Sequence, residues 1–227
     1  MKTLAVQLSL IAVTTVVTLP LKASLVQSPQ VSYQSTPYNG RFTFIRLRFE
    51  PLYWRPGNYA WGLDLKWNHD YPRAERNFME ILDELTYLRP NMGGGNILSM
   101  DDGELFKYPW AYLCEVGYWT LSEEEAKSLR AYLLKGGFLV VDDFIGDHWF
   151  NFEDKMRMVL PEGRLVRLDV SHPIFDSFFH IETLEFEHPT FPGLHPIYYG
   201  IFEDNDPAKR LMVIVNYNHD IGDYWEW

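Results

Sequence analysis

The segment 121–144, LSEEEAKSLRAYLLKGGFLVVDDF, decides the fold class of this chain. Two overlapping capping boxes predict a helix over 120–135, and the Gly-Gly pair that follows favours a left-handed helix end. The apolar run 138–141 then predicts a strand that is covered on both faces. Asp142 and Asp143 come directly after this run, at the edge where open α/β sheets bind ligands.

The rest of the chain alternates between strand and helix patterns. Alternating or continuous apolar runs predict strands, and apolar residues at helical spacing predict helices. The further strands are expected at 42–49, 96–100, 108–114, 164–170, 197–202 and 211–217, and the further helices from about Pro72 to before Pro90 and over 153–160. This alternation predicts an α/β fold with a mainly parallel, doubly wound sheet.

Composition limits the classes of partner. The net charge of −11 argues against a nucleic-acid role, because a basic face is needed to neutralise phosphates, and against binding to anionic lipid surfaces. The aromatic content of 16% suits apolar packing or an aromatic-lined cleft. We expect a small molecule or an envelope protein as the partner.

The N-terminus has the pattern of an export signal. Lys2 precedes a mostly apolar run over 4–21, and small residues follow it. Residues 1–23 are therefore expected to be a signal peptide or an N-terminal anchor, 24–40 a linker, and 41–227 the domain. The expected location is the periplasm or cell envelope, with membrane contact only through an uncleaved N-terminus.

Several motifs together resemble a known family. They are FTFIRLRF, DYPRAERNFMEILDELT, ELFKYPWAYL, LSEEEAKSLRAYLLKGGFLVVDD, SHPIF and NYNHDIGDYWEW, and they span residues 41–227. The chain resembles an uncharacterised bacterial domain-of-unknown-function family within the class I glutamine-amidotransferase-like superfamily, and is similar to its trehalose-utilisation-type proteins. The resemblance implies a three-layer flavodoxin-like sandwich. It also implies that family members continue past Trp227, so that this chain is truncated at its C-terminus.

The resemblance carries the fold and not the amidotransferase activity. Glutamine amidotransferases place a nucleophilic Cys on a strained strand-to-helix turn beside oxyanion-binding N–H groups. In the matching strand, FLVVDDFIG, an Asp stands at that position. Cys114 ends another strand without a preceding Gly, so a buried, inert thiol is the expected role.

The first candidate site follows the 138–141 strand. Asp142, Asp143, Asp147 and His148 offer oxygen and nitrogen ligands for a divalent metal. Asp142 and Asp143 are also candidate acid/base residues, since two close carboxylates raise one pKa. The alternative is that one Asp caps the next helix.

The second candidate site is the loop over 59–73. Asp64, His69 and Asp70 stand beside Trp67, a combination that suits a ligand with an apolar face and polar groups. The alternative is a loop held by its own tryptophans, with Asp70 as a helix cap.

The third candidate site is the C-terminal run that follows strand 211–217. Asn218 is a candidate ligand-binding residue, and His219 a candidate catalytic residue, alone or with Asp220. A simple turn is the alternative. Asp102, at another strand end, and His172, before Pro173, complete the expected ligand-binding set.

Two functions follow from these patterns. One is a non-catalytic module that binds a ligand or partner in the crevice. The other is a metal- or carboxylate-dependent hydrolase acting on carbohydrate or cell-envelope material. The sequence assigns no cofactor with certainty, and a divalent metal is the candidate.

Overall fold

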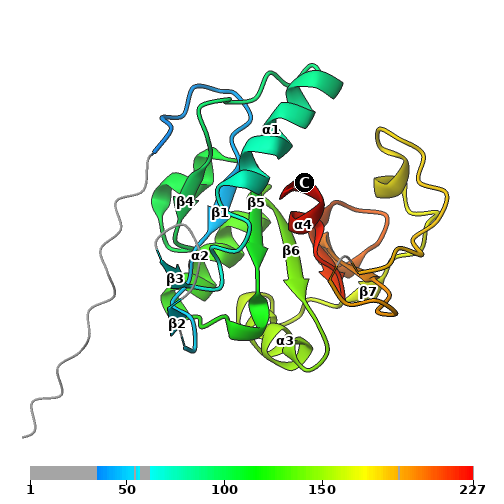
Figure 1. The fold of residues 1–227 in the computed structure, drawn as a ribbon. Helices are drawn as coiled ribbons and strands as arrows, with labels where there is room; N and C mark the ends of the chain where they lie inside the picture. The colour runs from blue at the N-terminus through cyan, green and yellow to red at the C-terminus, as the bar shows by residue number, and fades with distance from the viewer. Residues whose placement is uncertain (1–34, 54, 57–61, 189, 227) are drawn as a thin grey trace, which may run out of the picture. The chain divides into compact units, whose positions relative to one another are not determined.

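The computed structural model describes residues 35–53, 55–56, 62–188 and 190–226 (Figure 1). The expected signal segment at 1–23, and the linker up to residue 34, lie outside the described residues. Within the described part of the chain, no helix has the length and apolar character needed to span a bilayer.

In the part described, seven strands form one sheet and two more form a small hairpin-like pair. The sheet contains β1 (Ile45–Leu47), β4 (Asn96–Leu98), β5 (Trp110–Cys114), β6 (Phe138–Phe144), β7 (Val166–Arg167), β8 (Ile197–Phe202) and β9 (Leu211–Tyr217), and the small pair is β2 (Arg55–Pro56) with β3 (Leu63–Asp64). The helices are α1 (Arg73–Leu85), α2 (Glu123–Leu134), α3 (His148–Val159) and α4 (Ile221–Glu226), with short 3-10 helices η1 (Gly103–Lys107), η2 (Val116–Tyr118), η3 (Pro173–Asp176) and η4 (Glu203–Asn205).

The sheet is mostly parallel, as the sequence predicts. Its strand order is β4-β1-β5-β6-β9-β8-β7. The first five strands are parallel to one another, and β8 is antiparallel to both of its neighbours. Numbered along the chain, the five parallel strands have the order 2-1-3-4-5. The strand order therefore reverses between β1 and β5, which is the topological switch point of the sheet. Ligands of such sheets bind at the carboxyl ends of the strands near this switch.

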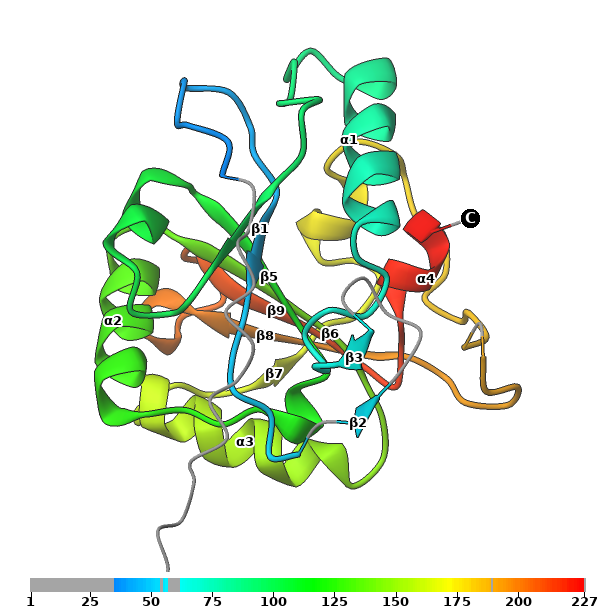
Figure 2. The ribbon, with the colours of Figure 1, turned by 60° about the vertical axis from the view of Figure 1, so that its left-hand side comes forward.

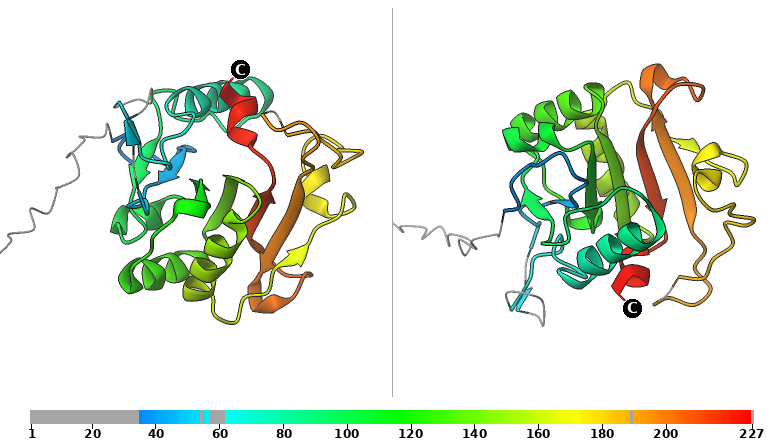
Figure 3. Two further views of the ribbon diagram at one scale, coloured as in Figure 1. Left: turned by 60° about the horizontal axis from the view of Figure 1, so that its bottom comes forward. Right: turned by 90° about the horizontal axis from the view of Figure 1, so that it is seen from above.

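Helices cover both faces of the sheet. Figure 3 shows α1 and α4 on one face and α2 and α3 on the other. Alternate strand residues supply the two cores: Leu139 and Val141 pack with α2 and α3, whereas Val140 packs with the α1 side. Figure 2 shows α1 and α4 lying side by side, and the Asn77 side chain of α1 donates a hydrogen bond to a main-chain carbonyl of α4. The architecture is compatible with a three-layer sandwich.

The α2–β6 block has the structure that its sequence predicts, and β6 extends further. Ser122 and Glu125 form a capping box, and Gly136 ends the helix with φ +117°. β6 continues through both aspartates to Phe144, with a register shift after Val141. The extra length is possible because β9 pairs with β6 on its other side.

Three local expectations differ from the structure. Helix α3 begins at His148 instead of residue 153, because Trp149 and Phe152 pack against Phe144 and extend the apolar face towards the N-terminus. Asp70 does not cap α1 with its side chain; it has φ +62° and only its main-chain carbonyl accepts a hydrogen bond from the helix. Helix α4 follows β9 where no helix is expected.

Candidate functional site

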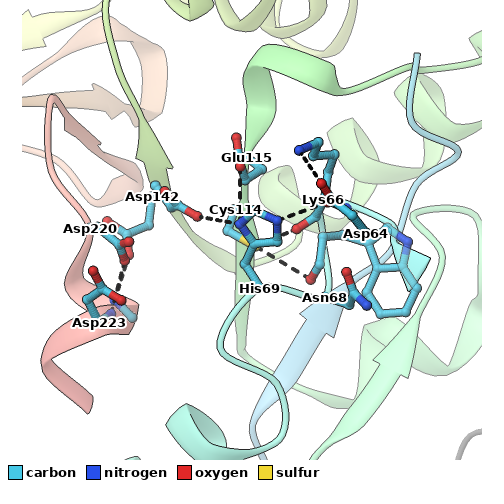
Figure 4. A network of polar contacts seen from close by, with 12 residues as sticks. Asp64, Lys66, Asn68, His69, Cys114, Glu115, Asp142, Asp220 and Asp223 are labelled. Carbon is cyan, nitrogen blue, oxygen red and sulfur yellow. Dashed lines mark hydrogen bonds and ion pairs between the residues drawn. The ribbon is translucent and has the colours of Figure 1, made fainter. Parts of the chain in front are cut away.

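A pocket of about 750 Å³ lies at the carboxyl edge of the sheet. Parts of the chain that are far apart in sequence form its walls: the loop before α1, the ends of β5 and β6, the stretch with His188, Thr190 and Phe191, and α4 with the residue before it. The carboxylates that line the pocket are Asp70, Glu115, Asp143, Asp220, Asp223 and Glu226. Figure 4 shows Asp220 and Asp223 on one side, opposite His69 and Glu115.

Backbone geometry turns Glu115 and Asp143 into this pocket. Glu115 directly follows β5, whereas Asp143 lies one residue before the end of β6, and each has a left-handed conformation, with φ of +52° and +54°. The main-chain N–H of Glu115 donates to the carbonyls of Asp142 and Asp143, which ties the two strand ends together. A left-handed residue ends the strand alternation, so both carboxylates stand at the sheet edge instead of over one face.

Asp142 lies in the core and not in the pocket. Its carboxylate accepts hydrogen bonds from the Tyr112 hydroxyl at 2.8 Å and from the main-chain N–H groups of Ile221 and Gly222 at 2.9 and 3.2 Å. Burial, followed by the neighbouring charge of Asp143, raises the pKa of Asp142. Through these contacts Asp142 holds the first turn of α4 against the sheet.

His69 is the cation on one side of the pocket. Its Nε2 lies 3.0 Å from Asp64, and its Nδ1 lies 3.1 Å from Glu115 and 3.5 Å from Asp143. Burial lowers the pKa of His69, but the hydrogen bond and charge of Asp143, with Glu115 and Asp64, outweigh it and raise the pKa to about 9. The ring is therefore an imidazolium at neutral pH that neutralises the carboxylates around it.

Asp70 and Asp220 lack a paired basic side chain of the kind that His69 provides for its neighbours, as far as the described residues go. In the described part of the chain, neither carboxylate forms an ion pair with a basic side chain, and a buried Oδ2 of Asp70 accepts no hydrogen bond. Asp220 is 7% exposed, and only one of its oxygens accepts a hydrogen bond, from the N–H of Asp223. Oxygens of Asp70, Asp143 and Asp220 all lie within 4.8 Å of one another.

The close carboxylates alter one another's protonation. Burial, with the charge of Asp143, raises the pKa of Asp70 to about 7. Burial, together with Asp143, Asp142 and Asp70, raises the pKa of Asp220 well above its usual range. The nearby charges of Arg46 and His69 thus only partly offset full ionisation of these carboxyls, and protons or a bound cation can stabilise the group.

A glycine makes this crowding possible. A Cβ on Gly222 would lie 2.3 Å from Oδ2 of Asp70 and 3.2 Å from Oδ1 of Asp220. Because no side chain fills that space, the start of α4 approaches the loop before α1 closely enough to bring the two carboxylates together.

A buried ion pair supports the floor of the pocket. Arg46 of β1 pairs with Glu75 of α1, and its Nη1 donates to the main-chain carbonyl of Trp67 at 2.9 Å. Arg46 is 1% exposed and lies against the rings of Phe44 and Tyr112, on the sheet face that α1 covers. The sulfur of Cys114 lies 3.2 Å from the same Nη1, and burial raises the pKa of this thiol. Cys114 is buried and is not part of the pocket lining.

Three further candidates from the sequence lie outside the pocket. His219 is 3% exposed, and its Nδ1 accepts a hydrogen bond from the N–H of Asp220; burial and then His188 lower its pKa to about 4. Asp147 is exposed at the start of α3 and makes no capping hydrogen bond. His148 packs its ring against Gly117 and Tyr118.

The remaining candidates have local partners. Asp102 caps η1 by accepting from the N–H of Glu104. Nδ1 of His172 accepts from Ile174, and its ring packs on Phe202. Asn218 accepts from the N–H of Gly146 at 3.2 Å and joins the loops after β6 and β9. The structure thus brings Asp70, His69 and Asp143 together from the expected set, and Asp64 supports them through His69.

Among the acidic and histidine residues that line the pocket, sequence reasoning missed Glu115, His188 and Glu226. Glu115 carried a usable signal, because it directly follows the strand YPWAYLC in the same way that Asp142 and Asp143 follow the apolar run 138–141. His188 and Glu226 carried none, since nothing in their neighbourhood predicts that these segments fold over the sheet edge.

A comparison with known protein families matches the part of the chain that forms the pocket. A family model described as Domain of unknown function (DUF4159) matches residues 51–227. The chain belongs to this family. The match covers every segment that lines the pocket, and it confirms the domain-of-unknown-function resemblance of the motifs. No curated protein matches the chain.

Proposed function

We propose that this domain is a ligand-binding module that holds a divalent cation between Asp70, Asp143 and Asp220. The single observation that carries the proposal is the convergence of Asp70, Asp143 and Asp220, of which Asp70 and Asp220 form no ion pair with a basic side chain among the described residues. Three carboxylates converge there within 4.8 Å, and a buried oxygen of Asp70 has no hydrogen-bond donor among the described residues.

The chemistry of the donors favours a hard cation. All three side chains offer oxygen, which Ca²⁺ and Mg²⁺ prefer, and no thiol or free imidazole is among them. His69 is a poor metal ligand here, because a metal at Nδ1 would displace a proton held by two carboxylates. We assign His69 the role of a fixed positive charge that positions Asp143.

Two finer assignments belong to the same proposal. The first is that the domain has a class I glutamine-amidotransferase-like fold without the nucleophile. The 2-1-3-4-5 order of the parallel strands supports this assignment. So does Asp143, which has φ +54° near the end of β6, where that superfamily has its Cys. The protein is exported, which the apolar run over 4–21 after Lys2 supports. A bound cation is also the first requirement of a metal-dependent hydrolase, which stays a prediction.

The test is calcium and magnesium titration of chelator-treated protein by isothermal calorimetry. Wild type is expected to bind one cation per chain, and Asp143→Asn is expected to lose that binding. Asn tolerates positive φ, so the variant keeps the local backbone.

Asp147→Asn is the matched control. It removes the same charge shortly after the same strand, from an exposed residue outside the carboxylate group, and is expected to bind as wild type does. Absence of binding by wild type, or equal binding by Asp143→Asn, contradicts the proposal.

A further inference from the structure

The pocket is much larger than a cation site. Its volume of about 750 Å³ lies in the range of pockets that hold small organic ligands. Beyond Asp70, Asp143 and Asp220, its lining comes mainly from α4 and from His188, Thr190 and Phe191, with Tyr71 and Phe191 as the aromatic residues; we call this part the outer half. This outer half has its own polar groups, which define the ligand that it fits.

His188 supplies a hydrogen-bond donor. It is 4% exposed, and its Nδ1 accepts from the N–H groups of Thr190 and Phe191 at 3.1 and 3.3 Å. In a neutral ring the proton is therefore on Nε2, and burial, which lowers the pKa of His188, keeps the ring neutral. Nε2 has no hydrogen-bond partner among the described residues, although the side chain lines the pocket. This donor therefore takes its acceptor from a ligand or from water in the pocket.

The carboxylates of α4 supply acceptors at the mouth of the pocket. Oxygens of Asp223, Glu226 and Asp70 lie within 4.8 Å of one another. Asp223 accepts from the Thr190 hydroxyl at 3.0 Å, which places it beside the segment that carries His188. The guanidinium of Arg73 stands 3.5 Å from Glu226 but is 58% exposed, so it neutralises that carboxylate only weakly.

The balance of charge selects among ligand classes. Six carboxyl groups line the pocket, against the cations His69 and Arg73. Raised pKa values favour the protonated forms of Asp70, Glu115 and Asp220, but even with all three protonated, Asp143, Asp223 and Glu226 leave an excess of one negative charge. An anionic ligand is repelled by this excess, whereas a cationic group gains an ion pair in a partly desolvated site. The free donor of His188 requires in addition an oxygen acceptor on the same ligand.

We propose that the outer half of the pocket binds a ligand in which a protonated amine stands next to an uncharged oxygen acceptor. The ammonium group pairs with Asp223 and Glu226, and the oxygen accepts from Nε2–H of His188. Tyr71 and Phe191 line the same pocket, where an aromatic ring can contact a cation. This ligand class goes beyond the divalent-cation site and does not require that the cation be bound.

Two sources share this chemistry, an amino-acid amide or peptide N-terminus and an amino sugar. The experiment therefore uses two matched pairs, alaninamide with N-acetylalaninamide and glucosamine with N-acetylglucosamine, followed by ligand-observed NMR on the intact protein. Within each pair the N-acetyl compound lacks the positive charge. We expect the amine of at least one pair to bind at least about tenfold more tightly than its acetylated partner, and the pair that binds identifies the source. Equal binding within both pairs, or no binding by either, overturns the proposal.

Variants assign the two contacts. His188→Asn keeps an acceptor oxygen for the N–H groups of Thr190 and Phe191 but removes the Nε2 donor, and Asp223→Asn removes one carboxylate charge. Each is expected to weaken amine binding by about tenfold. Glu185→Gln, an acid with an 83% exposed side chain outside the pocket, is the matched control and is expected to bind as wild type does.

Calcium titration of the same samples separates this proposal from the first. His188→Asn is expected to bind calcium as wild type does, because His188 is not among the proposed ligands. Loss of amine binding in the control, or unchanged amine binding in both variants, contradicts the assignment of the outer half. Absence of calcium binding with intact, charge-dependent amine binding contradicts only the cation proposal.

Discussion

Asp70→Asn is expected to make the protein more stable while removing its cation binding. Burial and the charge of Asp143 raise the pKa of Asp70 to about 7, so the folded protein holds this proton more tightly than the unfolded chain does. The stabilising effect of that proton is fully present below the ordinary pKa of 3.8 and is lost as the pH rises towards 7. An uncharged Asn has no proton to lose.

The size of the effect follows from the two pKa values. The difference between about 7 and the ordinary 3.8, at about 1.4 kcal/mol per pKa unit, corresponds to about 4 kcal/mol. The variant should therefore exceed wild type in the free energy of unfolding by about 4 kcal/mol at pH 8, and by only about 1 kcal/mol at pH 4.5. Asp70 has φ +62°, which Asn also tolerates, so backbone strain does not offset the gain.

Urea unfolding followed by tryptophan fluorescence measures both values, at pH 4.5 and pH 8 in chelated buffer. Calcium should raise the stability of wild type at pH 8 and leave Asp70→Asn unchanged, because a ligand stabilises only a folded state that binds it. Asp176→Asn, whose side chain is 66% exposed, should show no comparable gain. An Asp70→Asn variant that is less stable than wild type at pH 8, or equally altered at both pH values, would refute the reasoning.

Three further outcomes follow from the same contacts. In chelated buffer His69→Gln should be about 3 kcal/mol less stable to unfolding than wild type below pH 6.5. This deficit should disappear as the pH rises through about 9, because the imidazolium of wild type then loses its proton. A deficit that does not depend on pH contradicts the charge assigned to His69. Gly222→Ala places a Cβ against Oδ2 of Asp70 and should lower calcium affinity at least about tenfold by calorimetry, whereas unchanged affinity would show that Asp70 is not a ligand. Glu75→Gln leaves Arg46 buried without its counter-ion and should lower the free energy of unfolding by about 3–5 kcal/mol in urea titration, so a near-neutral effect would show that the pair is not closely coupled.

The α2–β6 block shows which features are predictable from sequence. Its capping box, its Gly-Gly end and its apolar strand involve residues within a few positions of one another, so the local sequence specifies them. The antiparallel direction of β8 and the presence of α4 depend on contacts with distant strands. The α3 start differs for the same reason, because packing against Phe144 of the preceding strand decides it.

The sequence predicted where in the fold some of the site residues lie, but not which side chains they contact. Ends of parallel strands mark the ligand edge of an α/β sheet, which made Asp143 a candidate, and a polar run before a helix did the same for Asp70. The interpretation of Asp70 as a helix cap is wrong, because its left-handed backbone turns the carboxylate towards Asp143 and Asp220. Asp142 and Asp143 are adjacent in sequence, yet one holds α4 and the other lines the pocket.

The sequence by itself determined the class of this protein: an acidic α/β domain with a mainly parallel sheet and charged residues at the ends of its strands. Periodicity and capping are short-range properties, and they survive without knowledge of the fold. Only the tertiary structure decided which charges meet. Whether a carboxylate is neutralised by His69 or only partly compensated beside Asp220 depends on desolvation and on distances of a few ångströms between segments remote in sequence, and these exist only after the sheet edge, the loop before α1 and α4 have packed together.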